Sequence, residues 1–245
     1  MSTEQNGNSL VAVLTGAGGG IGRATALKLA QQGIRLILLG GNNVEKLEET
    51  RKLVQELTEV FCLPGDLTDL SFLADAAQTV AQILGKVDVL INNAGMALNR
   101  PFEEVSEEEF DKIFHINVKT PYFLTQKMLP LLKQSEQATV INISSVVGHS
   151  GYPNQSAYSA SKHALFGFTK SLANEFYKEN IRVHAISPGG VYTDMVKISR
   201  PDLTPEGMIL PEDIAEIVWF FLSHRGNAVV DEIIVHRVNK EPFSV

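Results

Sequence analysis

Tyr158 and Lys162 are the residues of this sequence best suited to move a proton, and they lie four positions apart. On a helix, this spacing places both side chains on one face. A neighbouring ammonium group favours the phenolate form, so it lowers the pKa of a tyrosine from its ordinary value of about 10. Such a tyrosine can exchange a proton with a carbonyl or alcohol oxygen near neutral pH. The same spacing is common on ordinary helix surfaces, so the pair indicates chemistry only together with other residues.

Two hydroxyl side chains, Ser144 and Ser145, stand at the end of a predicted strand. In open α/β sheets, ligands bind at the carboxyl edge of the strands. A hydroxyl at that edge can hold a substrate oxygen by a hydrogen bond. The serines therefore support a site that acts on an oxygen-bearing carbon.

A glycine-rich loop follows the first predicted strand and precedes a helix, where residues 15–22 read TGAGGGIG. Glycine permits a tight turn and lets the backbone approach a pyrophosphate, whose charge is held by the free N–H groups at the helix start. In this strand, turn and helix context, the pattern predicts dinucleotide binding rather than a merely flexible turn. The expected cofactor contacts here are Gly16, Gly18, Gly20, Ile21 and Gly22.

The end of the second predicted strand indicates which nicotinamide cofactor is bound. An acidic residue there holds the ribose 2'-hydroxyl of NAD(H), whereas a basic residue accepts the 2'-phosphate of NADP(H). Residues 38–43 read LLGGNN and contain neither type. Because no carboxylate repels a phosphate and the backbone around Gly40 can donate N–H groups to one, the sequence favours NADP(H), with NAD(H) as the alternative.

Short apolar runs alternate with longer segments of helical period, a pattern typical of repeated βαβ units. The runs are mostly apolar rather than alternating, which indicates strands buried on both faces. We predict an α/β fold: a doubly wound, Rossmann-like parallel sheet of seven strands with helices on both faces. The predicted strands are residues 10–14, 34–39, 59–63, 87–92, 139–144, 182–187 and 228–235. The predicted helices are residues 21–32, 44–57, 70–84, 107–133, 156–178 and 211–223.

No linker or repeat divides the chain, so we expect one domain over residues 1–245. Residues 1–8 are expected to form a flexible tail. Residues 194–210 are expected to form a loop over the substrate pocket.

The composition argues against several classes of protein. The net charge is −7, and no cluster of Lys and Arg offers a face to nucleic acid. No apolar run has the roughly 18 residues that a membrane span requires. Cys62 is the only cysteine, so no internal disulfide forms, and the first residues lack the apolar run of a signal peptide. No histidine has metal-site spacing. We therefore expect a cytoplasmic protein without a metal that acts on a small molecule.

In these motifs the sequence resembles the short-chain dehydrogenase/reductase family, over about residues 10–222. The family's Thr-Gly-x-x-x-Gly-x-Gly motif matches residues 15–22, its Asn-Asn-Ala-Gly segment matches residues 92–95, and its Tyr-x-x-x-Lys motif matches residues 158–162. The resemblance implies a catalytic tetrad of Asn117, Ser145, Tyr158 and Lys162.

Each member of this tetrad has an implied role. Tyr158 exchanges the proton and Ser145 holds the substrate oxygen. Lys162 binds the nicotinamide ribose and lowers the Tyr158 pKa. Asn117 bends its helix and holds a water that completes a proton relay with Lys162.

The resemblance also extends the two binding sites. Further expected cofactor contacts, besides Tyr158 and Lys162, are Asp66, Leu67, Asn93, Ala94, Gly95, Pro188, Gly189, Val191 and Thr193. The expected substrate contacts are Ser145, Val147, His149, Tyr152 and Tyr158. His149 is included because it follows Ser145 closely in the sequence, and an ordinary loop residue is the alternative. One departure is at the C-terminus, where many family members have an Asp-Gly-Gly ending and residues 230–237 here read VDEIIVHR.

The segment 156–178 carries apolar or small residues on more than one face. Because a surface helix needs only one apolar stripe, we expect self-association into a dimer or tetramer through residues 107–133 and 156–178. Burial by loops of the same chain is the alternative.

The leading hypothesis is an NAD(P)(H)-dependent oxidoreductase, a reductase of small ketones or 3-oxoacyl compounds in which Tyr158 is the acid and base. The alternative is a nucleotide-binding redox sensor or scaffold without turnover.

Overall fold

The computed structural model describes residues 9–41, 43–194, 196 and 204–241. The predicted tail at residues 1–8, and positions 195 and 197–203 of the predicted substrate loop, lie outside the described residues.

A sheet of seven parallel strands forms the centre of the molecule, in the order β3-β2-β1-β4-β5-β6-β7. The predicted doubly wound sheet is thereby confirmed. The strands are β1 Val11–Thr15, β2 Arg35–Leu39, β3 Val60–Leu63, β4 Val89–Asn92, β5 Thr139–Ile143, β6 Arg182–Pro188 and β7 Glu232–Val235. The strand order reverses between β1 and β4, and a crevice outside the carboxyl ends at such a point is where α/β sheets bind ligands.

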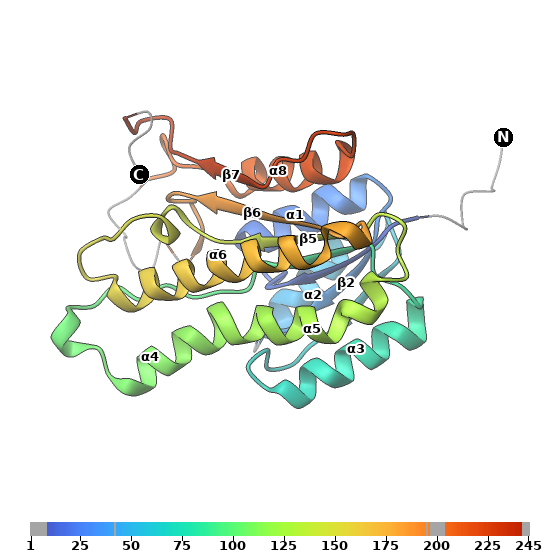
Figure 1. Cartoon of the computed structure of the whole chain (residues 1–245), viewed down its shortest axis with the longest axis horizontal. Helices are drawn as coiled ribbons and strands as arrows, with labels where there is room; N and C mark the ends of the chain where they lie inside the picture. The colour runs from blue at the N-terminus through green and yellow to red at the C-terminus, as the bar shows by residue number, and fades with distance from the viewer. Residues whose placement is uncertain (1–8, 42, 195, 197–203, 242–245) are drawn as a thin grey trace.

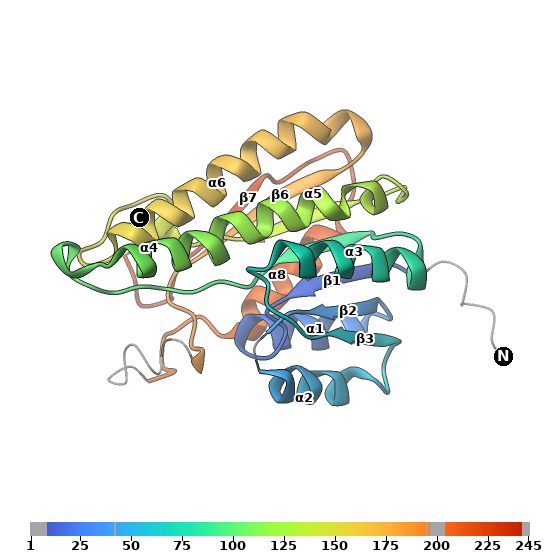
Figure 2. The ribbon, with the colours of Figure 1, turned by 90° about the horizontal axis from the view of Figure 1, so that it is seen from below.

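Helices cover both faces of the sheet. Figure 2 shows α3, α5 and α6 on one side and α1, α2 and α8 on the other. The described α-helices are α1 Gly20–Gln31, α2 Val44–Val54, α3 Leu70–Leu84, α4 Glu107–Phe114, α5 Thr120–Leu132, α6 Ser156–Phe176 and α8 Pro211–Ser223. Short 3-10 turns follow β4, β5 and α6, at Phe102–Glu104, Val146–Gly148 and Tyr177–Glu179.

The strands are buried because each of their faces packs on a layer of helices. Every residue of β1, β4 and β5 is buried, as their unbroken apolar character predicts. One core cluster joins the sheet to α1 and α8, for example Leu29 with Val218, and a second joins it to α3 and α5, for example Val80 with Met128. The two cores hold the carboxyl ends of the strands in register.

Two predicted elements differ from the structure. The helix over residues 107–133 is interrupted by a π-helical turn, His115–Lys119, which separates α4 from α5. The last strand is shorter than the predicted 228–235, because its pairing with β6 begins only at Glu232 opposite Ala185. Among the described residues, no helix is both long and apolar enough to cross a bilayer.

Candidate active site

A cleft of about 730 Å³ opens at the carboxyl ends of the strands. The loops that follow β1, β4, β5 and β6 form its walls, and α6 supplies one side. In Figure 1 the arrows of β6 and β7 point toward the end of the molecule where α6 begins. Most of the predicted site residues line this cleft: Gly16, Gly18, Gly20, Ile21, Asn93, Ala94, Gly95, Ser145, Val147, Tyr152, Tyr158, Lys162, Pro188, Gly189, Val191 and Thr193.

The glycine loop has the shape of a phosphate cradle. Gly16 has a φ of +68°, which a residue with a side chain rarely adopts, and a Cβ on Gly22 would lie 2.1 Å from the carbonyl oxygen of Gly16. Gly22 does not itself line the cleft; its missing side chain lets α1 begin directly against the turn. No side chain caps α1 at Gly19, and no atom lies within 4 Å of where a Cβ of Gly19 would stand. Free N–H groups and open space at a helix start fit a dinucleotide pyrophosphate.

Two polar side chains fix this loop in place. The Arg23 guanidinium donates to the Gly18 carbonyl at 2.9 Å and, from its Nε, to the Thr50 hydroxyl on α2 at 3.1 Å. Asn93, after β4, donates from Nδ2 to the Thr15 carbonyl at 2.9 Å. The loop is therefore held from both sides before any ligand binds.

Tyr158 and Lys162 lie one turn apart on α6, as their spacing predicts. The Lys162 ammonium donates to the Ile143 carbonyl at 2.9 Å and lies 6.0 Å from the centre of the Tyr158 ring. Burial lowers the pKa of Lys162 to about 8, because no carboxylate compensates the cost of desolvating its charge. The lysine is thus anchored to the end of β5, with its amine directed into the cleft region.

The surroundings of the Tyr158 phenol favour its protonated form. Burial raises its pKa above the ordinary value, and a hydrogen bond with Ser145 offsets part of that rise. The predicted lowering of this pKa by Lys162 stays a prediction, since burial is the dominant effect in the protein alone. A phenol held neutral is a proton donor, which suits the reduction of a carbonyl.

Ser145 is buried at the start of the 3-10 turn Val146–Gly148. Its Oγ donates to the Pro188 carbonyl at 3.3 Å and accepts from the Val147 N–H at 3.2 Å. These contacts place one hydroxyl between the loops after β5 and β6, next to the Tyr158 phenol. A substrate oxygen in the cleft would meet both hydroxyl groups.

Asn117 lies in the π-helical turn and is buried. Its Oδ1 accepts from the Met96 N–H at 2.9 Å, while its Nδ2 donates to the Met96 carbonyl at 2.9 Å and to the Ser161 hydroxyl at 3.0 Å. The side chain thus ties the loop after β4 to α6, directly beside Lys162. A π turn interrupts the helix at this residue; the predicted bend and the predicted water relay stay predictions.

The residues expected at the adenine end lie together beyond the lining of the cleft. A Cβ on Gly40 would lie 2.3 Å from Leu67 Cγ, so the ends of β2 and β3 pack closely. The Asp66 carboxylate accepts from the Thr68 N–H at 2.8 Å and shapes the turn before α3. Direct cofactor contacts of Gly40, Asp66 and Leu67 therefore stay predictions.

His149 does not line the cleft, contrary to the sequence-based expectation. Its Nε2 lies 2.6 Å from a Glu232 carboxylate oxygen on β7, and its ring packs edge-on against Phe166. Because Glu232 lies on β7 at the edge of the sheet, this contact directs the imidazole toward that edge. The sequence does not reveal the contact, since the two residues are far apart along the chain. His149 is a structural residue that joins the loop after β5 to the last strand.

Comparison with known proteins decides the family. The family model described as short chain dehydrogenase matches residues 10–204. The chain belongs to the short-chain dehydrogenase family. It is 32% identical to a 3-oxoacyl-[acyl-carrier-protein] reductase of Thermotoga maritima over 91% of this chain and 94% of that protein. It is 35% identical to levodione reductase of Leifsonia aquatica over 80% of this chain and 74% of that protein.

A solved structure supports the same assignment. An alcohol dehydrogenase from Thermococcus sibiricus, in complex with 5-hydroxy-NADP, superposes with a TM-score of 0.87 at 29% identity, covering 96% of this chain and 99% of that one. The chain is accordingly an NAD(P)-dependent oxidoreductase that interconverts carbonyl and alcohol groups.

Several residues of this dehydrogenase that line the cleft were not predicted. Lys46 extends from the first turn of α2, Met208 comes from the segment before α8, and the segment after β7 contributes His236, Arg237 and Lys240. In the sequence, nothing distinguishes Lys46 from an ordinary lysine on the surface of a helix. The C-terminal residues depart from the family's usual ending, but only the pairing of β7 with β6 places them at the cleft.

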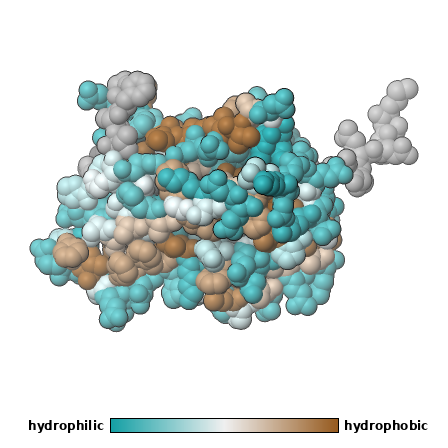
Figure 3. Space-filling model, viewed as in Figure 1, coloured by the Kyte–Doolittle hydropathy of each residue, from teal (hydrophilic) through white to brown (hydrophobic). Residues whose placement is uncertain are grey.

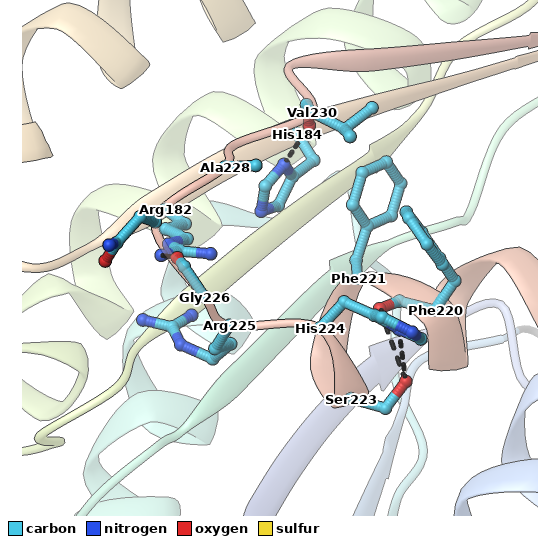
Figure 4. A pocket seen from close by; sticks show the side chains of 11 residues that line it. Arg182, His184, Phe220, Phe221, Ser223, His224, Arg225, Gly226, Ala228 and Val230 are labelled. Atoms are coloured by element: carbon cyan, nitrogen blue, oxygen red, sulfur yellow. Dashed lines mark hydrogen bonds between the residues drawn. The ribbon is translucent and has the colours of Figure 1, made fainter.

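A second cavity of about 500 Å³ lies at the amino ends of β6 and β7, away from the glycine loop (Figure 4). His184 is buried there and stacks on Phe221, with ring centres 4.3 Å apart. Its Nδ1 donates to the Val230 carbonyl at 2.7 Å. Burial lowers the pKa of His184 from 6.5 to about 4, so this ring is neutral at pH 7.

This buried histidine predicts that the dehydrogenase loses stability in mild acid. Between pH 6.5 and 4 the unfolded chain binds a proton at His184 that the folded chain does not, so unfolding becomes more favourable as the pH falls. The expected loss from this residue is about 2 kcal/mol between pH 7 and pH 5. Urea unfolding at both pH values measures it. The loss should shrink in His184→Phe, and equal losses in the variant and the wild type would contradict the assignment.

Proposed function

We propose that Tyr158 is the acid and base of this dehydrogenase and that Ser145 holds the substrate oxygen. The observation that carries the proposal is the placement of a neutral, buried phenol beside a second hydroxyl in the cleft, with the Lys162 amine one helical turn away. No aspartate, glutamate or histidine among the described residues lines the cleft at the loop after β5. The phenol is the group there whose proton suits transfer to an oxygen.

The cofactor supplies the hydride when it is bound. The glycine loop and the start of α1 bind the pyrophosphate, while Pro188, Val191 and Thr193 form the wall that receives the nicotinamide end. In reduction, Ser145 donates a hydrogen bond to the substrate carbonyl oxygen and Tyr158 Oη gives it a proton; in oxidation, the Tyr158 phenolate takes the proton back. An oxygen held by two hydroxyl groups carries developing negative charge at lower cost.

Lys162 and Asn117 support the tyrosine in this proposal. The Lys162 ammonium lies on the same face of α6 and stabilises the phenolate that each reduction leaves behind. Asn117 is a positioning residue: its amide fixes the Met96 backbone and the hydroxyl of Ser161, the residue that precedes Lys162. A Cβ on Gly95 would lie 3.0 Å from Asn117 Oδ1 and 3.6 Å from Lys162 Nζ, which shows how closely the two side chains approach.

We propose a small ketone or a 3-oxoacyl compound as the substrate. The cleft beside Tyr158 is walled by apolar or aromatic side chains, Met96, Val147, Tyr152 and Met208. The names of the relatives, a 3-oxoacyl-[acyl-carrier-protein] reductase and a levodione reductase, point the same way. NADPH oxidation measured against a panel of ketones, quinones and acyl thioesters tests this proposal. Turnover of none of them, with cofactor-dependent binding of a protein partner instead, would favour the sensor alternative.

NADP(H) is the cofactor we propose. Lys46 lines the cleft beside Gly18, since a Cβ on Gly18 would lie 3.3 Å from Lys46 Cβ. The Lys46 ammonium lies 3.4 Å from Asp194 across the mouth of the cleft. A solved relative, the Thermococcus sibiricus enzyme, carries an NADP derivative. An ammonium group beside the glycine loop suits the 2'-phosphate of NADP(H), a group that NAD(H) lacks.

The cofactor proposal predicts that Lys46→Gln weakens NADP+ binding by about fivefold, since the lysine is half-exposed and screened by solvent. Binding of NAD+ should change little. Isothermal titration of both cofactors measures the ratio, and Lys127→Gln, an equal change of charge on α5, is the control. A wild-type protein that binds NAD+ more tightly than NADP+ would overturn the proposal.

Self-association in the cytoplasm through residues 107–133 and 156–178 stays a prediction. Of two apolar surfaces, the first described below lies in the predicted region and the second lies outside it. Brown, apolar surface lies over α4 and the start of α5 in Figure 3, where Phe110 and Tyr122 are exposed. A second apolar area covers α8 and β7, where Val229 and Ile234 are exposed. Two such faces would suffice for a tetramer. Sedimentation velocity measures the assembly.

A further inference from the structure

The segment after β7 is fixed to the rim of the cleft. The Gly189 N–H donates to the Val235 carbonyl at 2.8 Å, which extends the β6–β7 pairing to the loop that follows β6. Beyond it, the Lys240 N–H donates to the Arg237 carbonyl at 3.0 Å and closes a turn. That turn packs on the segment before α8, since a Cβ on Gly207 would lie 2.6 Å from Asn239 Nδ2.

This anchored turn brings positive charge to the cleft. Arg237 and Lys240 both line it. Within the described ranges, neither has an ion pair with an acidic side chain, and the contact of the Arg237 guanidinium is the Met208 sulfur at 3.4 Å. The neighbouring His236 Nε2 is buried and has no hydrogen-bond partner in the described part of the chain. Uncompensated donors at the wall of a cleft favour an anion as the ligand.

Arg237 contacts a different loop from the one that we propose to bind the pyrophosphate of the cofactor. The cofactor's pyrophosphate site is the glycine loop, with Lys46 near Gly18. Arg237 is instead packed on the loop after β6: its Cδ lies 3.6 Å from where a Cβ of Gly190 would stand. Ser145 bonds the carbonyl of Pro188, two residues earlier. Arg237 and the substrate-binding hydroxyl of Ser145 therefore contact the same loop, two residues apart.

We infer that the substrate is a carbonyl compound that also carries an anionic group, a carboxylate or phosphate, and that Arg237 binds that group with help from Lys240. The planar fork of an arginine matches both anions, and the long lysine side chain reaches the same opening. This inference rests on the proposed function of Tyr158 and Ser145, to which it adds the class of substrate.

Matched pairs of ketones test the inference. Levulinate and methyl levulinate differ by one carboxylate charge, and dihydroxyacetone phosphate and dihydroxyacetone differ by one phosphate. For the wild-type enzyme with its cofactor, we expect kcat/KM for the charged member of at least one pair to exceed that for the neutral member by about tenfold or more. The pair that shows this preference identifies the anion.

Variants show whether the preference comes from the C-terminal turn. Arg237→Gln should remove about tenfold from kcat/KM for the charged ketone and far less for the neutral one, while Arg237→Lys should restore part of the loss. Lys127→Gln removes one charge on α5 and should leave the preference unchanged. Equal turnover of charged and neutral ketones by the wild type, or a preference that survives Arg237→Gln, overturns the inference.

Failure of the inference can be distinguished from failure of the proposed function. If the wild type reduces neither member of any pair, the proposed function fails on those substrates. Isothermal titration of levulinate and its methyl ester into the cofactor-loaded protein then decides the inference by itself. Tighter binding of the acid that depends on Arg237 supports it, and equal or absent binding of the two overturns it.

Discussion

Replacing Tyr158 by phenylalanine is expected to lower kcat by about 100- to 10,000-fold, the range that a positioned general acid contributes. The substitution removes one hydroxyl from the cleft and keeps the aromatic ring. Ser145 would still meet the substrate oxygen, but no described group beside it could supply the proton at neutral pH. Steady-state kinetics with any accepted ketone measures the loss.

Two controls exclude a folding defect as the cause of the loss: the affinity of the variant for the cofactor, and the activity of a Tyr152→Phe variant. The affinity for the cofactor should stay within about twofold of the wild type, since the glycine loop is untouched. Tyr152→Phe removes a hydroxyl from another tyrosine of the same cleft and should cost far less than Tyr158→Phe. Comparable activity of the Tyr158→Phe variant and the wild type would contradict the assignment of the acid.

Gly22→Ala is expected to be the most damaging single-methyl change in the chain. The added Cβ would lie 2.1 Å from the Gly16 carbonyl oxygen and 2.8 Å from Asn93 Nδ2. Neither a backbone carbonyl nor an anchored amide can give way, so the start of α1 must move off the glycine turn. We expect a loss of about 3 kcal/mol in unfolding free energy, the upper range for overpacking. We also expect a loss of about 100-fold in kcat/KM for the cofactor, because the phosphate donors are displaced.

Gly167→Ala is the matched control for this change. Gly167 is exposed on α6, and no atom lies within 4 Å of where its Cβ would stand. The substitution should stabilise the protein by about 0.5–1 kcal/mol, since alanine favours a helix. Thermal unfolding and cofactor titration measure both variants. Wild-type cofactor affinity in Gly22→Ala would show that the close contact is not needed for binding.

The parts of the site that sequence predicts are those set by local spacing. A separation of four positions on a helix places Lys162 beside Tyr158. The order of strand, glycine turn and helix places the phosphate-binding loop. Neither depends on contacts with distant parts of the sequence. The alternating apolar and helical segments likewise predict the parallel sheet, since buried strands need helices on both faces.

The parts that sequence does not predict depend on partners far along the chain. His149 turns away from the cleft because Glu232 binds it from a strand 83 positions later. The π turn at Asn117 depends on hydrogen bonds to Met96 and Ser161, which no helical period reveals. The Tyr158 pKa rises because the phenol is buried, and this burial forms only when α6 packs against the sheet and its loops. Arg237 reaches the cleft only through the pairing of β7 with β6.

The central claim is that this cleft carries out hydride transfer to a carbonyl carbon, with Tyr158 supplying the proton. Reduction of an accepted ketone with cofactor deuterated at the transferring position of the nicotinamide tests it most directly. The account predicts one deuterium on the carbinol carbon of the product alcohol from the wild type, and a product yield that falls with the Tyr158→Phe variant. A protein that binds the labelled cofactor but forms no deuterated alcohol from any ketone of the panel would contradict it.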